Sequence, residues 1–74
     1  MNKTLFVLGG TGFIGHEVVI QAVQAGWHVK ALVRSEEGAN KLRQVGAQPV
    51  VSDISQPETW VAEVRGSSVM IDLT

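Results

Sequence analysis

Four short apolar runs recur along the chain, separated by segments of mixed polarity. Continuous apolar runs of this length are typical of strands that are buried on both faces, as in a parallel sheet. The segments between them carry helical spacing or helix-start signals. The pattern therefore predicts the element order β-α-β-α-β-α-β, with strands at Leu5–Leu8, His28–Val33, Pro49–Val51 and Val69–Leu73.

The first helical segment is Phe13–Ala25, and its apolar residues lie on one broad face. Such a face is what a helix needs in order to pack on a sheet. Gly26 stands where a helix C-terminal glycine is expected. The apolar row consists of Ile14, Val18, Ala22 and Ala25, with Val19 and Val23 beside it.

Two further helices are indicated by their start and stop signals. The second is expected to begin after Ser35, whose side chain suits an N-cap, and to end near Gln44, before Gly46. Two glutamates lie in its first turn, where the helix dipole favours acidic side chains. The third begins in the Ser-Gln-Pro-Glu sequence at 55–58, which is typical of a capping box, and ends near Gly66.

The alternation of strands and helices with short connections predicts right-handed crossovers and a parallel sheet. For a three-layer α/β fold of the Rossmann-like type, the expected strand order is 3-2-1-4. Residues 1–74 would then form one small domain, half of a nucleotide-binding fold. Its fourth strand would be an uncharged edge, so we expect self-association through that edge or pairing with a missing C-terminal segment.

Three glycines follow the first strand at Gly-x-x-Gly-x-x-Gly spacing. Gly9 would turn the chain off the strand, Gly12 would let the backbone approach a phosphate, and Gly15 would let the helix pack closely on the sheet. The N–H groups of the first helical turn favour an anion, and the Thr11 hydroxyl adds a donor. The loop predicts a dinucleotide pyrophosphate site, with a ligand-free structural turn as the alternative.

The loop sequence Gly-Gly-Thr-Gly-Phe-Ile-Gly at 9–15 resembles that of the extended and atypical short-chain dehydrogenase/reductases, which include nucleotide-sugar epimerases and NmrA-like NAD(P)-binding proteins. The resemblance covers nearly the whole chain. It implies a Rossmann-type NAD(P)-binding domain in which Phe13 and Ile14 join the loop glycines in contacting the cofactor. It also implies that Asp53 accepts a hydrogen bond from the adenine amino group while Ile54 packs on the base; an ordinary turn aspartate is the alternative.

Arg34 occupies the position, after the second strand, where NAD-binding proteins of this fold carry an acidic residue. An arginine cannot accept a hydrogen bond from the ribose hydroxyls, but it can pair with a 2′-phosphate and lie over the adenine. The residue therefore favours NADP over NAD, and an exposed surface arginine is the alternative. Ser35 is a candidate for a second phosphate contact, or for an N-cap alone.

Composition narrows the possible partners. Six Lys and Arg against seven Asp and Glu give a net charge of −1, without the basic cluster that a nucleic-acid groove needs. No apolar run approaches the roughly 20 residues of a membrane span. The chain has no cysteine, which excludes disulfides and thiol catalysis and is consistent with the cytoplasm. His16 and His28 stand apart from any metal-ligand cluster, and Trp27 and Trp60 are expected to be packing residues.

The catalytic residues that the resemblance implies are not all present in this sequence. The resembled family uses a Tyr-x-x-x-Lys pair as its acid, and this chain has no tyrosine. It also has Asp72 and Thr74 where the family often has Asn and Ala, next to the nicotinamide-side ribose. Two functions therefore stay open. One is the NADP-binding portion of an oxidoreductase or epimerase, and the other is a non-catalytic nucleotide-sensing or association module.

Overall fold

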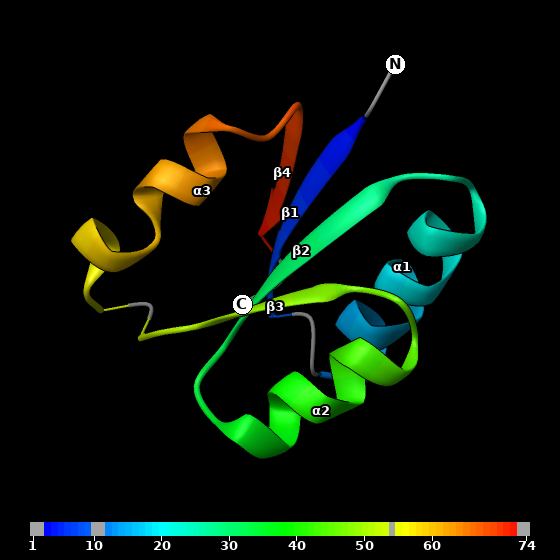
Figure 1. Cartoon of the computed structure of the whole chain (residues 1–74), viewed down its shortest axis with the longest axis horizontal. Helices are drawn as coiled ribbons and strands as arrows, with labels where there is room; N and C mark the ends of the chain where they lie inside the picture. Colours follow the sequence, from blue (N-terminus) through cyan, green and yellow to red (C-terminus); the bar gives the residue numbers. More distant parts are fainter. Residues whose placement is uncertain (1–2, 10–11, 54, 73–74) are drawn as a thin grey trace.

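The structure, a computed structural model, describes residues 3–9, 12–53 and 55–72 (Figure 1). The strands and helices follow the predicted alternation, and the α/β class is confirmed. The strands are β1 Thr4–Leu8, β2 His28–Val33, β3 Gln48–Val51 and β4 Val69–Asp72. The helices are α1 Phe13–Gln24, α2 Glu36–Gln44, the 3-10 helix η1 Pro57–Thr59 and α3 Val61–Arg65.

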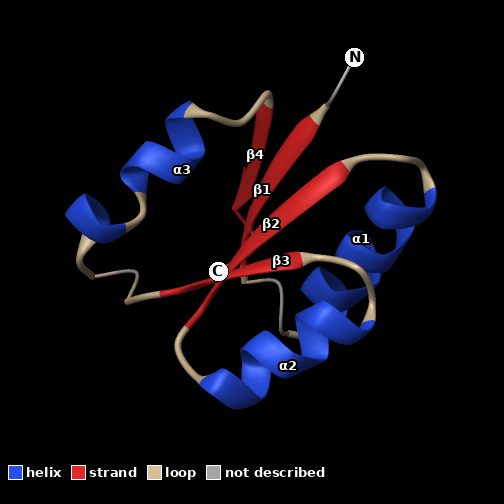
Figure 2. Ribbon diagram, in the orientation of Figure 1, coloured by secondary structure: helices blue, strands red, loops and turns tan. Residues whose placement is uncertain are grey.

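The four strands form one parallel sheet in the order β3-β2-β1-β4, as predicted. Leu5 lies between Val29 on β2 and Val69 on β4, and this register aligns the carboxyl ends of all four strands. The chain steps one way from β1 to β3 and then returns across β1 to reach β4. Because both kinds of crossover are right-handed, α1 and α2 cover one face of the sheet and α3 covers the other (Figure 2).

The two faces have unequal cores. The face under α1 and α2 holds most of the buried apolar side chains of the described residues, and its core residues are Leu5, Val7, Val19, Val29, Ala31, Val33, Ala39, Leu42 and Ala47. The face under α3 buries Phe6, Leu8 and Leu32, against which Trp60 and Val64 pack from the helical side. The short α3 segment therefore depends on a few large side chains for its attachment to the sheet.

The third helix differs from the prediction in two ways. It is split into η1 and α3, which meet at Trp60. The prediction of a capping box at residues 55–58 is wrong, because the N-cap of η1 is Gln56 and its side chain forms no cap bond. Ser55 instead gives its backbone N–H and its hydroxyl to the carboxylate of Asp53, at 2.9 and 2.8 Å. The Asp53 carboxylate therefore takes the backbone N–H that a capping box would pair with Glu58, and the Ser55 hydroxyl acts here as a donor.

Other boundaries shift by one residue. Helix α1 ends at Gln24, with Ala25 as its C-cap. Pro49 is the second residue of β3, not the first, because Gln48 already pairs with Lys30. The strand lies at the edge of the sheet, where a proline is tolerated. The predicted N-cap of α2 is confirmed, since the Ser35 hydroxyl accepts from the Gly38 N–H at 3.1 Å.

Gly46→Ala is expected to destabilise the fold more than Gly26→Ala. Both glycines follow helices with φ of 88° and 93°, a conformation that costs an L-residue about 1–2 kcal/mol. A Cβ at Gly46 would also lie 3.2 Å from Val23 Cγ1, whereas one at Gly26 would meet nothing within 4 Å. Urea unfolding of both variants measures the difference, and equal losses would show that Val23 moves aside freely.

Candidate functional site

The predicted site residues that the structure describes gather at the carboxyl edge of the sheet. Gly9 follows β1, Arg34 follows β2 and Asp53 lies two residues after β3. The strand order reverses between β1 and β4, because β2 and β3 lie on one side of β1 and β4 lies on the other. In open α/β sheets, ligands bind outside the carboxyl ends of the strands at such a reversal point.

The glycine loop turns sharply at Gly9. Its φ of 88° lies in the left-handed region, so this position favours glycine for conformational reasons. The Gly12 N–H then donates to the Gly9 carbonyl at 3.3 Å and closes the turn before α1 begins. Gly10 and Thr11 lie outside the described residues, so the predicted Thr11 contact stays a prediction.

Gly12 has no such conformational requirement. Its φ of −71° and ψ of 169° are open to any L-residue. A Cβ placed there would lie 3.6 Å from the Gly9 carbonyl oxygen, which is ordinary van der Waals contact. The residue is exposed, and the fold itself has room for a methyl group. The described residues therefore impose no requirement for glycine at this position.

The N-terminus of α1 presents backbone donors that the helix does not pair internally. The N–H groups of Phe13, Ile14 and Gly15 belong to the first helical turn, which lacks intrahelical partners for them. The N-cap Gly12 supplies no side-chain bond, and this turn contains no acidic residue. The positive end of the helix dipole is therefore uncompensated at the reversal point, which is suited to an anion.

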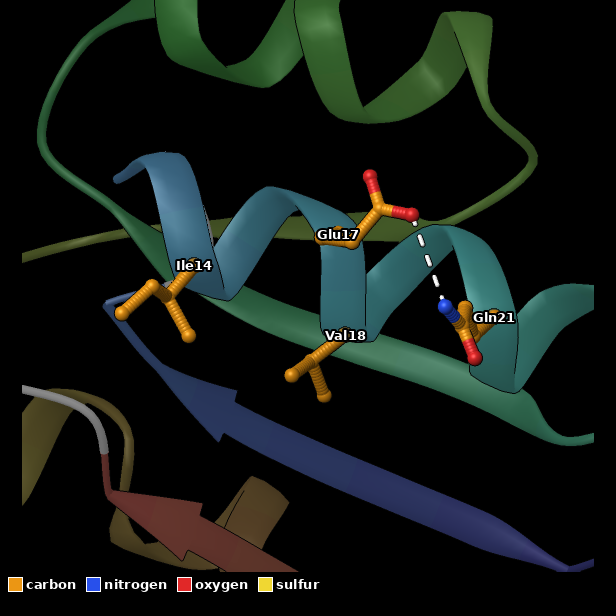
Figure 3. A pocket seen from close by; sticks show the side chains of 4 residues that line it. All are labelled: Ile14, Glu17, Val18 and Gln21. Atoms are coloured by element: carbon orange, nitrogen blue, oxygen red, sulfur yellow. Dashed lines mark hydrogen bonds between the residues drawn. The ribbon is translucent and has the colours of Figure 1, made fainter.

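The Ile14 side chain points to the flank of α1 (Figure 3). It is 67% exposed and lines an open hollow of about 400 Å³ on the flank of α1. Figure 3 shows it on the same side of the helix as Val18, with Glu17 and Gln21 completing the lining. The part of Ile14 available to a phosphate at the helix N-terminus is thus its backbone N–H. Gly15 is buried, in keeping with its predicted place against the sheet.

Arg34 and Asp53 come together at the other end of the site. The Ser52 N–H donates to the Val33 carbonyl at 2.8 Å, which extends the pairing of β2 and β3 and brings the following residues to one edge. The N–H of Ser55, then its hydroxyl, and then the charge of Arg34 hold the pKa of Asp53 below its usual range. Both side chains are exposed, and within the described residues Arg34 forms no ion pair.

Two other predicted contacts have partial outcomes. The Ser35 hydroxyl accepts the N–H of Gly38 as the cap of α2, and its own proton is still available to a phosphate, so that contact stays a prediction. Ile54 lies outside the described residues, as do Leu73 and Thr74. Asp72 ends β4 opposite Leu8, at the same edge of the sheet as the glycine loop.

Trp60 is predicted from the sequence as a packing residue that caps the sheet, with stacking on a nucleotide as the minor alternative. Its ring does stack on Phe6, with centroids 6.2 Å apart. Its indole N–H also donates to the backbone carbonyl of Asp53 at 3.2 Å. No local spacing rule connects positions 53 and 60, because the contact forms only when η1 folds the chain back. The sequence therefore contains no signal for this second role.

Two classes of site find no support in the described part of the chain. Residues 3–9, 12–53 and 55–72 contain no group of three His, Asp or Glu side chains that could hold a metal ion. Within the same ranges, every helix is too short or too polar to cross a bilayer.

Comparison with known proteins finds clear relatives. The sequence profile of the NmrA-like family matches residues 1–74. A photosystem II assembly factor of Trieres chinensis is 41% identical over 69 residues, which make up 93% of this chain and 22% of the relative. A 4-hydroxy-2-methyl-3-oxo-4-farnesyl-3,4-dihydroquinoline-1-oxide ketoreductase of Stigmatella aurantiaca is 40% identical over 65 residues, 88% of this chain and 20% of the relative.

A solved structure, AtPrR2 with NADP+ and (+)pinoresinol, has a similar fold. The TM-score is 0.82 at 24% identity, and the match covers 100% of this chain and 26% of that one. This likeness supports the Rossmann-like architecture. The chain spans about a fifth of the length of the two curated relatives, whose names describe different roles.

Proposed function

We propose that this chain, which belongs to the NmrA-like family, binds NADP(H) as the nucleotide-binding portion of a reductase or epimerase. The observation that carries the proposal is the geometry of Gly12. This exposed residue lies at the N-terminus of α1, which has no side-chain cap, and the described residues leave room there for a Cβ that glycine lacks. The ketoreductase relative and the NADP+ in the similarly folded structure support this choice of chemistry.

The proposed pose lays the cofactor along the carboxyl edge of the sheet. The pyrophosphate lies over the N–H groups at the start of α1, where the Gly12 backbone permits close approach. The adenine amino group donates to the Asp53 carboxylate, whose pKa is lowered by the bonds from Ser55. Arg34 pairs with the 2′-phosphate, and the Ser35 hydroxyl adds a donor beside it.

The bound nicotinamide would supply the hydride chemistry, while the described residues bind and orient the cofactor. None of them is assigned as the proton donor. The family acid, a tyrosine paired with lysine, has no counterpart in this sequence. We therefore propose cofactor binding for this chain, and a substrate-binding part contributed by another segment or another chain.

Calorimetric titration with NADP+ and, separately, with NAD+ tests the proposal. We expect saturable binding of both nucleotides with a preference for NADP+, because only the 2′-phosphate offers Arg34 a full charge partner. The preference should shrink as the salt concentration rises. A folded protein that binds neither nucleotide would overturn the proposal.

A second candidate is a nucleotide-sensing or association module without chemistry. It is favoured by the open edge of β4, where Val69 and Met70 are 43% and 47% exposed. Unpaired edge strands with apolar side chains promote pairing with another strand. We propose that this edge is covered by a further strand, from a second copy of the chain or from a missing C-terminal segment.

Met70→Lys is expected to reduce self-association. A lysine on an edge strand places a charge that a partner strand would have to desolvate. Sedimentation should show a concentration-dependent oligomer for the unmodified chain and a smaller species for the variant. Gln24→Lys, which adds the same charge at the exposed end of α1, is the control and should leave the oligomer unchanged. A monomer at every concentration would exclude a second copy as the partner.

A further inference from the structure

Trp60 connects the small core to the nucleotide edge of the sheet. Its ring stacks on Phe6 at an interplanar angle of 17° and packs in the cluster under α3. Its indole N–H reaches back to the carbonyl oxygen of Asp53, 3.2 Å away. One side chain thus contacts both the buried face of the sheet and the backbone of a residue in the proposed site.

The segment from Ser52 to Trp60 is braced by its own hydrogen bonds. The Asp53 carbonyl also accepts from the Gln56 N–H at 3.0 Å, and the Thr59 hydroxyl donates to the Gln56 carbonyl at 2.7 Å. A further bond joins the hydroxyls of Ser52 and Thr59. The Asp53 side chain is exposed, so burial does not fix it. The carboxylate is held by its bonds to Ser55, while the position of the Asp53 backbone depends on this bracing and on the contact with Trp60.

The two groups of Asp53 are held by different partners. Ser55 binds the carboxylate, through bonds of 2.9 and 2.8 Å to one oxygen. The Trp60 indole N–H donates to the backbone carbonyl. Because the Trp60 ring stacks on Phe6 of β1, this bond fixes the position of the Asp53 peptide relative to the sheet. Loss of the indole N–H would leave the carboxylate charged and still bonded to Ser55, but on a peptide whose position relative to the sheet is less defined.

We infer that Trp60 is a positioning residue for the nucleotide base, acting through Asp53 to favour a purine with a 6-amino group over one with a 6-oxo group. This inference rests on the proposed function. A carboxylate accepts a hydrogen bond from an amino group and repels a carbonyl oxygen, so its placement determines the preference. Trp60 itself does not touch the nucleotide in this arrangement.

The test compares NADP+ with nicotinamide hypoxanthine dinucleotide phosphate, in which a 6-oxo group and an N1–H replace the 6-amino group and the N1 acceptor of adenine. Calorimetric titration of the purified protein gives the dissociation constant for each. Trp60→Phe keeps an aromatic ring against Phe6 and removes the N–H donor. Trp27→Phe is the matched control, because Trp27 lies beyond the other end of the strands, with the Lys3 ammonium 5.5 Å from its ring centroid.

We expect Trp60→Phe to weaken NADP+ binding about three- to tenfold, the range for one neutral hydrogen bond. Binding of the hypoxanthine analogue should not change, and Trp27→Phe should affect neither. In an Asp53→Ala background, Trp60→Phe should have no further effect on NADP+ affinity, because its action passes through Asp53.

Three outcomes would overturn the inference. An equal loss for both nucleotides would mean that Trp60 only supports the fold, as would a loss that persists in the Asp53→Ala background. Unchanged NADP+ affinity in Trp60→Phe would remove the role altogether. If the unmodified protein binds NADP+ but does not discriminate between the two bases, the inference fails while the proposed function stands. If it binds no nucleotide, both fail together.

Discussion

Gly12→Ala is expected to reduce NADP(H) affinity at least tenfold while leaving the fold intact, and Gly12→Val is expected to abolish binding. A pyrophosphate that approaches the backbone closely would collide with any Cβ at this position. The described residues leave room for a methyl group, because the Gly9 carbonyl oxygen, the nearest of their atoms beyond the two chain neighbours, would lie 3.6 Å from it. Calorimetric titration measures the affinity.

The same substitution makes opposing small contributions to stability. Alanine lowers the conformational entropy of the unfolded chain, which stabilises by about 0.4–1 kcal/mol when φ is compatible. Alanine is also a poorer N-cap than glycine, and Gly12 is the N-cap of α1. We therefore expect a net change in the free energy of unfolding below about 1 kcal/mol, measured by urea denaturation.

Gly66→Ala is the matched control for this experiment. Gly66 has φ of −81° and ψ of 0°, which an L-residue adopts without strain, and a Cβ there would lie 3.8 Å from the nearest described backbone oxygens, so alanine is tolerated there as it is at Gly12, although the two backbone conformations differ. It lies at the end of α3, close to the start of β4 and away from the carboxyl edge of the sheet. Full NADP+ affinity in Gly12→Ala would mean that no phosphate uses the space beside Gly12.

Arg34→Asp is expected to reverse the cofactor preference. Loss of a hydrogen bond to a charged group costs about 1.5–3 kcal/mol, so NADP+ affinity should fall roughly 10- to 100-fold, with repulsion of the 2′-phosphate adding to this. NAD+ affinity should hold or rise, because the new carboxylate can accept from the ribose hydroxyls. The ratio of the two dissociation constants is the measurement.

The neighbouring Asp53 limits how far NAD+ binding can improve. Arg34 is one of the groups that lower the pKa of Asp53, and the substitution replaces that positive charge with a negative one. Lys41→Asp makes the same change in net charge on the exposed surface of α2 and serves as the control. An equal loss for both nucleotides in Arg34→Asp would show that Arg34 does not read the 2′-phosphate.

Much of the fold was predictable because its signals are local. An apolar run such as Leu5–Leu8 is typical of a strand buried in a parallel sheet, and glycines such as Gly26 and Gly46 are suited to the left-handed residue after a helix. Ser35 caps α2 as expected, because its hydrogen-bond partner lies three residues away in the chain. Right-handed crossovers then leave few ways to order the strands.

The gathering of the candidate site residues at one edge of the sheet was predictable for a related reason. In a parallel sheet the carboxyl ends of all strands meet at one edge, so Gly9, Arg34 and Asp53 had to lie near one another once the strands were assigned. The identity of the cofactor is a chemical prediction from Arg34, and the nucleotide titrations decide it.

The sequence by itself determined the elements, their order and the edge of the sheet at which they place polar groups, because these depend on periodicity, caps and handedness. Only the tertiary structure decided the split of the third helix and the second role of Trp60. Ser55 could have capped the third helix or bonded to Asp53, and in the structure its N–H and hydroxyl donate to the Asp53 carboxylate. The hydrogen bond from Trp60 to Asp53 forms only once Phe6 holds the indole ring. Phe6 and Trp60 are far apart in the sequence, and a contact of this kind produces no periodic pattern from which it could be predicted.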